Sequence, residues 1–154
     1  QNPVCSGRDR YDRVVEEFEP DVVLSLYGWP GGGGQELDDG TIVQPCEAGF
    51  DERWLRDYRE MVERLGRTAT VVVSTVAPPA IPVADQGPDP RCLNELIRQI
   101  DAPQFDYQGW LCPNYDCADS ASLRSDGVHF RNSGPLQRDV MAAIVTQVLS
   151  VAGY

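Results

Sequence analysis

The sequence contains no lysine, and its positive charge is scarce compared with its negative charge. All thirteen basic residues of the 154-residue chain are arginine, and they face 24 aspartates and glutamates, so the formal net charge is −11. Binding to nucleic acid needs clustered basic residues that neutralise phosphates. The same shortage of cations disfavours binding to anionic lipid head groups. The composition therefore predicts that nucleic acid is not a partner.

Long apolar runs are also absent. Runs such as Val22–Leu24 and Val71–Val73 are far below the ~20 apolar residues that a membrane-spanning helix needs. The first residues lack the charged and apolar regions of a signal peptide. Because the chain begins at Gln1, we expect a mature or excised piece, with any targeting or membrane segment outside it.

Histidine occurs once, whereas cysteine is common. The five cysteines are Cys5, Cys46, Cys92, Cys112 and Cys117. A zinc site would favour two cysteines separated by two residues, with histidine support. The closest pair here has four residues between its members, and His129 is the single histidine. We therefore predict structural disulfides and an oxidising compartment, and neither a metal nor a cofactor. The odd count leaves one cysteine free or with a partner outside the chain.

Apolar residues at helical spacing predict four helices. The first ends at Pro20, the second has Asp51 as its N-cap and Gly66 after its end, and the last begins near Pro135. Their apolar positions are Tyr11, Val14, Val15 and Phe18; Trp54, Leu55, Tyr58, Met61, Val62 and Leu65; Leu93, Leu96, Ile97 and Ile100; and Val140, Met141, Ile144, Val145, Val148 and Leu149. We expect the last six, and Trp54 of the second helix, to be buried.

Three segments have the composition of strands. They are Asp21–Leu26, the β-branched run Thr68–Thr75 and, more weakly, Phe105–Leu111. The segments Gly28–Phe50, Ala77–Pro90 and Cys112–Arg131 are expected to be loops, and Asp38, Asp39, Asp51 and Glu52 to be a solvated face.

Strands that alternate with helices predict parallel βαβ units. We therefore expect one domain over residues 1–154, an α/β fold with a three-layer α/β/α sandwich around a parallel sheet. Three strands make a thin core, and central parallel strands need neighbours on both sides. The pattern thus predicts a domain that lacks one or more N-terminal strands.

Ligands of open parallel sheets bind at the carboxyl ends of the strands. One chemically suggestive segment there contains Asp126 and His129. A general base needs an imidazole with a pKa near neutrality, and a carboxylate on its second nitrogen to fix the tautomer. The turn Asp-Gly-Val would bring the carboxylate back to the histidine. The alternative is a single histidine in a polar loop before the last helix.

The segment Asp126-Gly127-Val128-His129-Phe130, followed by a helix opening at Gly134-Pro135, resembles the DxxH block of SGNH (GDSL-like) hydrolases. Over nearly its whole length, the chain is most similar to the extracytoplasmic SGNH domains of bacterial acyltransferase-3 membrane proteins. The resemblance implies a flavodoxin-like sandwich in which His129 is the general base and Asp126 orients it.

The strand from Pro20 to Leu24, followed by Gly28 and Trp29, is similar to the strand that carries the family's oxyanion-hole glycine. The resemblance implies that the backbone N–H of Gly28 stabilises an oxyanion. Trp29 would either line an acyl or sugar pocket or be a core aromatic. The family's Gly-x-Asn-Asp block is not met, because Trp29, Pro30 and Gly31 follow Gly28.

The family's nucleophile block, Gly-Asp-Ser, is missing from the chain. Several other serines are present: Ser25, Ser74, Ser120, Ser122 and Ser125. The first two belong to predicted strands, and a nucleophile in the same loop as its base rarely reaches it. We therefore expect the nucleophilic serine upstream of Gln1.

The region from Leu111 to Cys117 resembles a cysteine pair often found before the DxxH block. We predict a Cys112–Cys117 disulfide, a second between Cys46 and Cys92, and a partner for Cys5 upstream of the chain.

The function implied by the resemblance is an O-acyltransferase or esterase that acts on acyl esters of cell-envelope sugars or glycolipids. Its partners would be such a substrate and a membrane acyltransferase domain in the same polypeptide, and its location extracytoplasmic, in the envelope or secreted. The alternatives are a secreted stand-alone SGNH esterase, and a non-catalytic extracellular binding module that has lost its serine.

Overall fold

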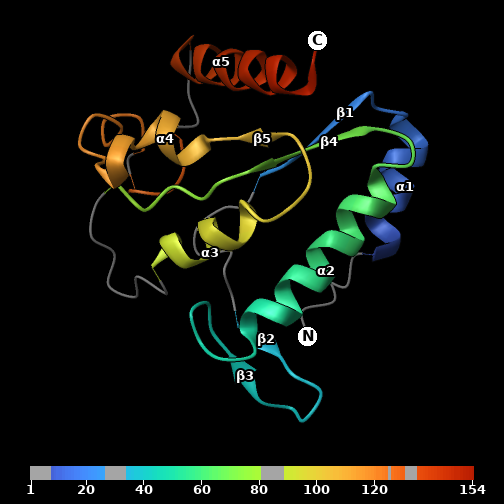
Figure 1. The fold of residues 1–154 in the computed structure, drawn as a ribbon. Helices are drawn as coiled ribbons and strands as arrows, with labels where there is room; N and C mark the ends of the chain where they lie inside the picture. The colour runs from blue at the N-terminus through green and yellow to red at the C-terminus, as the bar shows by residue number, and fades with distance from the viewer. Residues whose placement is uncertain (1–7, 27–33, 81–88, 125, 131–134) are drawn as a thin grey trace.

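A parallel sheet of three strands forms the centre of the fold, in the order β1–β4–β5 (Figure 1). The computed structural model describes residues 8–26, 34–80, 89–124, 126–130 and 135–154. The strands are β1 (Val22–Ser25), β4 (Thr70–Ser74) and β5 (Gln104–Phe105). Val22 is in register with Thr70, and Val73 with Gln104. The predicted parallel pairing of the first two strands is confirmed.

Successive residues of β4 point to opposite faces of the sheet, and both faces are buried. Val71 and Val73 belong to the core cluster on one side, and Val72 belongs to the cluster on the other. Burial on both faces explains the uninterrupted β-branched run that identified this strand in the sequence.

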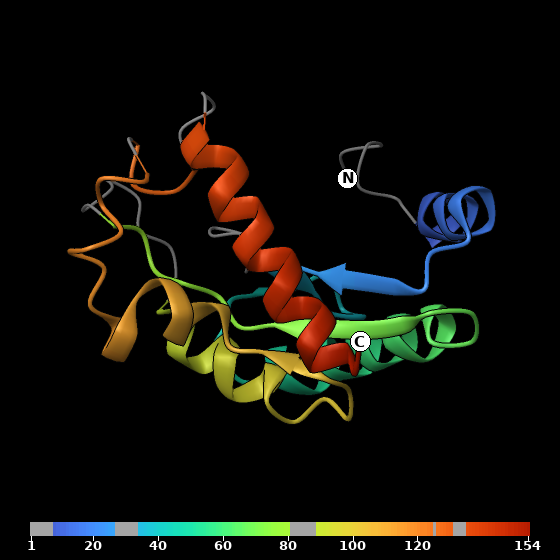
Figure 2. The same cartoon turned by 90° about the horizontal axis from the view of Figure 1, so that it is seen from above.

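Helices cover both faces of the sheet (Figures 1 and 2). Residues of α2 and α3 pack with Val71 and Val73, whereas residues of α4 and α5 pack with Val72. The helices are α1 (Arg8–Phe18), α2 (Phe50–Leu65), α3 (Pro90–Ile97), α4 (Tyr107–Leu111) and α5 (Pro135–Ala152), with a 3₁₀ turn, η1 (Pro113–Tyr115). The chain is thus a mixed α/β domain with a parallel sheet between helices. No helix in the described ranges is long and apolar enough to cross a membrane.

The second predicted helix is present, with its start two residues earlier than expected. Its N-cap is Gly49, with a left-handed φ of 88°, and Asp51 lies in the first turn rather than at the cap. An acidic side chain in the first turn still interacts favourably with the positive end of the helix dipole. Trp54 is 2% exposed and stacks on Tyr58, with 4.5 Å between ring centroids. The prediction that Trp54 is a core residue is confirmed.

The prediction of a strand over Phe105–Leu111 is wrong beyond its first residue. The strand ends at Phe105, and Tyr107–Leu111 is the helix α4. Asp106 begins this helix because its carboxylate accepts the backbone N–H of Gly109 at 3.1 Å. A local side-chain cap of this kind outweighs the β propensity of the aromatic residues beside it.

The amphipathic patterns of α1 and α5 predict more burial than the structure has. In α5 the residues Val140, Ile144 and Val148 are buried, but Met141, Val145 and Leu149 are 48%, 50% and 37% exposed. In α1 Tyr11, Val14 and Phe18 are exposed, and Val15 is partly buried. Each helix therefore has an apolar side that no described residue covers.

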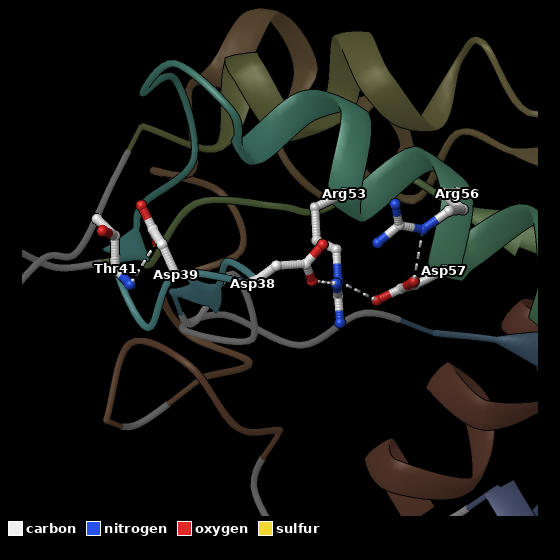
Figure 3. Close-up of polar contacts among 6 residues, drawn as sticks. All are labelled: Asp38, Asp39, Thr41, Arg53, Arg56 and Asp57. Carbon is white, nitrogen blue, oxygen red and sulfur yellow. Dashed lines mark hydrogen bonds and ion pairs between the residues drawn. The ribbon is translucent and has the colours of Figure 1, made fainter.

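The segment predicted as a long loop contains a short antiparallel pair, β2 (Gln35–Glu36) and β3 (Ile42–Val43). Arg53 of α2 pairs with Asp38 of the connecting turn at 3.0 Å and with Asp57 at 3.1 Å (Figure 3). Asp39 accepts the backbone N–H of Thr41, and this bond lowers the pKa of Asp39. The ion pair between Asp38 and Arg53 thus connects the β2–β3 turn to α2 at the surface.

The six residues after β4, residues 75–80, are termed the post-β4 segment. Hydrogen bonds connect this segment to three other parts of the chain. The backbone N–H of Val76 donates to Asn94 Oδ1 at 2.7 Å, and Asn94 Nδ2 donates to Val76 O at 2.9 Å. Thr75 Oγ1 donates to Asp106 Oδ1 at 3.0 Å and accepts the N–H of Gln108 at 2.8 Å. Asn94 is fully buried, so its bonds replace water for the backbone groups of this segment.

Both predicted disulfides are present in the structure. Cys46 is bonded to Cys92, and Cys112 to Cys117. The first joins the segment before α2 to α3, and the second closes a short ring after α4. Cys5 lies outside the described residues. Two disulfides fit a protein of an oxidising compartment.

We expect the two disulfides to contribute unequally to stability. Cys46 and Cys92 are 46 residues apart, and Cys112 and Cys117 only 5. Loop-closure entropy then predicts losses of about 4 kcal/mol and about 2 kcal/mol on replacing each pair with serines. Urea unfolding of the two double variants measures this difference. A greater loss for the Cys112–Cys117 variant would show that local contacts, rather than chain entropy, determine its effect.

Candidate functional site

The Asp126–His129 turn brings the two predicted catalytic side chains together. His129 Nδ1 lies 2.8 Å from Asp126 Oδ2, while Asp126 Oδ1 accepts the backbone N–H groups of Val128 at 2.9 Å and His129 at 2.7 Å. Gly127 has a φ of 83°, a left-handed conformation that glycine adopts without strain. The sequence folds this way because a short acidic side chain can bond the backbone two and three residues further on.

Two backbone hydrogen bonds fix this turn at the carboxyl end of the sheet. Gly127 O accepts the N–H of Ala80, in the post-β4 segment, at 2.7 Å, and Gly127 N donates to Arg124 O at 2.9 Å. The turn lies in the connection between α4 and α5, drawn in orange in Figure 2. This is the end of a parallel sheet at which ligands bind.

Hydrogen bonding determines the charge state of the carboxylate. The bond from the His129 side chain, followed by the backbone bonds of His129 and Val128, holds the pKa of Asp126 well below its usual range. An ionised Asp126 can only accept, so Nδ1 of His129 must be the donor. The lone pair of the neutral ring is then on Nε2. That nitrogen makes no hydrogen bond with any residue of the described ranges, and the His129 side chain is 81% exposed.

No serine of the described ranges is hydrogen-bonded to His129. Ser25 Oγ lies 2.8 Å from the hydroxyl of Tyr58, and the buried Ser74 donates to Ser25 O at 3.1 Å. Ser120 is also buried and donates to Cys117 O at 3.0 Å. Ser122 Oγ faces Asp119 O at 3.5 Å. Ser125 lies outside the described residues. The structure thus unites the base with its carboxylate but pairs neither with a serine.

The other predicted site residues, Gly28 and Trp29, lie outside the described residues. Just before them, a groove of about 500 Å³ runs beside β1. Its lining includes the consecutive residues Val23, Leu24, Ser25 and Leu26, together with Trp54 and Tyr58 from α2. Consecutive residues of a strand point to opposite faces, so the groove reaches the edge of β1, with residues of α2 forming most of the rest of its lining.

The sequence did not reveal the role of Arg124, whose side chain makes three hydrogen bonds beside the turn. Its guanidinium is buried and donates to Pro78 O, Ser120 Oγ and Cys112 Sγ. An arginine in a polar segment is ordinarily solvated, so only its place two residues before Asp126 could have suggested a role. The described ranges contain no cluster of histidine, cysteine and carboxylate side chains that could hold a metal ion.

The geometry defines an α/β domain with an oriented acid–base pair at the carboxyl end of a parallel sheet. Comparison with protein-family models, curated proteins and solved structures finds no match to this chain.

The titration of Asp126 tests the hydrogen bonds of the turn. We expect the carboxyl ¹³C signal of Asp126 to titrate well below the usual range, and His129→Ala to raise its pKa because the largest favourable bond is removed. The pKa should stay low in this variant, since the two backbone bonds remain.

A carboxyl whose pKa is lower in the folded state than in the unfolded state stabilises the fold at pH values above its unfolded pKa, about 3.9. This stabilisation is lost as the pH falls through the pKa of the folded state. The signals of the other aspartates are the internal control, and Asp126→Asn identifies the signal. Titration of Asp126 in the ordinary range would contradict the turn geometry.

Proposed function

We propose that this chain is the acid–base part of an SGNH-type (GDSL-like) serine esterase or O-acyltransferase domain of the cell envelope. The observation that carries the proposal is the bond of 2.8 Å between His129 Nδ1 and Asp126 Oδ2, with both residues held by one turn. A hydrogen bond between imidazole and carboxylate is the arrangement that a serine nucleophile requires of its general base.

The proposed mechanism uses His129 Nε2, the ring nitrogen that makes no hydrogen bond with the described residues. His129 Nε2 takes the proton of a serine hydroxyl as the serine oxygen attacks the carbonyl carbon of an acyl ester. The imidazolium, stabilised by Asp126, then gives this proton to the departing alcohol, which leaves an acyl-serine. Water or a sugar hydroxyl then attacks the acyl-serine, and His129 accepts its proton. His129 returns this proton to the serine oxygen as the acyl–serine bond breaks, which releases an acid or a new ester and restores the serine hydroxyl. The backbone N–H of Gly28 is the proposed donor to the oxyanion.

The nucleophilic serine is proposed to come from a segment preceding Gln1 in the natural polypeptide. The edge of β1 supports this assignment, because within the described ranges β1 pairs only with β4 and the groove reaches its other edge. The unpaired N–H and C=O groups of an edge strand such as β1 can accept a further strand. A strand docked there would complete a flavodoxin-like sandwich and deliver a serine to its carboxyl end. The disulfides agree with an extracytoplasmic location.

Hydrolysis of p-nitrophenyl acetate tests the proposal. We expect the 154-residue chain alone to be nearly inactive, and a longer polypeptide with an upstream Gly-Asp-Ser to be active. In the longer polypeptide His129→Ala should reduce kcat by several orders of magnitude. Asp126→Asn should reduce it about 10⁴-fold, because the imidazole adopts the wrong tautomer.

Asp116→Asn is the matched control. Asp116 also accepts a backbone N–H two residues further on, from Ala118 at 3.0 Å, but contacts no histidine. It should leave kcat unchanged. An upstream sequence without Gly-Asp-Ser would contradict the enzyme proposal and favour a binding module. Activity of the 154 residues alone that depends on His129 would instead place the nucleophile inside the chain.

A further inference from the structure

Arg124 joins three segments of the chain beside the catalytic turn. Its Nη1 donates to Pro78 O at 2.8 Å, and its Nη2 donates to Ser120 Oγ at 2.8 Å and to Cys112 Sγ at 3.1 Å. These acceptors lie in the post-β4 segment, in the turn after the short disulfide ring and in the ring itself. A planar guanidinium with donors in fixed directions suits this task, which a single ammonium group cannot perform.

The main chain of Arg124 contacts the same turn. Its carbonyl accepts the N–H of Gly127, and Gly127 O accepts the N–H of Ala80. Two residues that flank Asp126 are therefore attached to the post-β4 segment, Arg124 through its side chain at Pro78 and Gly127 through its carbonyl at Ala80. Asp126 lies between these two attachments, so they limit where its carboxylate can point.

The charge of Arg124 has no ion-pair partner within the described ranges, and its Nε has no acceptor there. Burial of a cation is costly unless an anion compensates it. Two groups attract the guanidinium electrostatically, Tyr107 and Asp126. Burial raises the pKa of Tyr107, so the phenol is neutral near pH 7. Of these two groups, Asp126 is then the one that is negatively charged near pH 7, in the ionised state that accepts from His129.

We propose that Arg124 is the positioning residue of the Asp126–His129 pair, its guanidinium fork holding the turn in the conformation that keeps His129 as the Nδ1–H tautomer. This proposal rests on the proposed function for its catalytic meaning. It does not depend on the upstream serine, because the pair forms within these 154 residues.

The single histidine makes the test direct, since every imidazole signal in the 154-residue chain comes from His129. Long-range ¹H–¹⁵N spectra above the imidazole pKa give the population of the two neutral tautomers. We expect mainly the Nδ1–H form in the unsubstituted chain. Asp126→Asn should shift it towards the Nε2–H form that free histidine prefers. Arg124→Met should lose most of the Nδ1–H population, and Arg124→Lys should not restore it, because lysine keeps the charge without the fork.

Backbone amide spectra of α2 and β4 show whether each variant is folded. If Arg124→Met does not fold, Ser120→Ala takes its place, because it removes one acceptor of the fork and leaves the arginine. It should reduce the Nδ1–H population in the same direction by a smaller amount. Ser122→Ala is its matched control, since Ser122 has no contact with Arg124, and it should change nothing.

The outcomes separate the two proposals. An unchanged tautomer in Asp126→Asn overturns the Asp126–His129 pair and the proposed function with it. A shift in Asp126→Asn without a shift in folded Arg124→Met or Ser120→Ala overturns the Arg124 proposal alone. Full retention of the Nδ1–H form in Arg124→Lys overturns the role of the fork.

Discussion

The dry environment of β4 is the constraint on which the other parts of the structure depend. This strand is buried on both faces and paired on both edges, so the chain that leaves it must keep satisfying its backbone polar groups without water. Asn94 and Arg124 serve this need at Val76 and Pro78. The Asp126–His129 turn serves it at Ala80, through Gly127. The position of the site is thus a consequence of how the central strand ends.

The elements that could be predicted from the sequence are those with a regular apolar pattern. The elements that were missed depend on single contacts or are too short to show a pattern. The strands β1 and β4 and the helix α2 were identified because burial imposes a regular apolar pattern on them. The helix α4 was missed and predicted as a strand, since its formation depends on one cap by Asp106. The β2–β3 pair was missed because strands of two residues leave no periodicity. The exposed apolar sides of α1 and α5 show that an apolar stripe indicates a helix without indicating what covers it.

The residues of the candidate site also differ in how well the sequence predicts them. Asp126 and His129 were predicted because their contact is local and needs only three residues and a glycine turn. Arg124 could not be predicted, since its burial and its contact with Pro78, 46 residues away in the sequence, arise only from the fold. Gly28 and Trp29 remain predictions, as does the upstream serine. Local chemistry is readable in a single sequence, whereas the support that fixes its geometry is not.

The uncovered apolar sides of α1 and α5 affect how copies of the isolated chain behave towards one another. Apolar surface of this kind attracts a second molecule, and the net charge of −11 is the opposing force that keeps copies apart. Both salt, which screens the repulsion, and acid, which neutralises the carboxylates, weaken that force while leaving the attraction intact. The acidic composition that argues against a nucleic-acid partner therefore also keeps apart the copies of a domain whose helices present apolar residues to water.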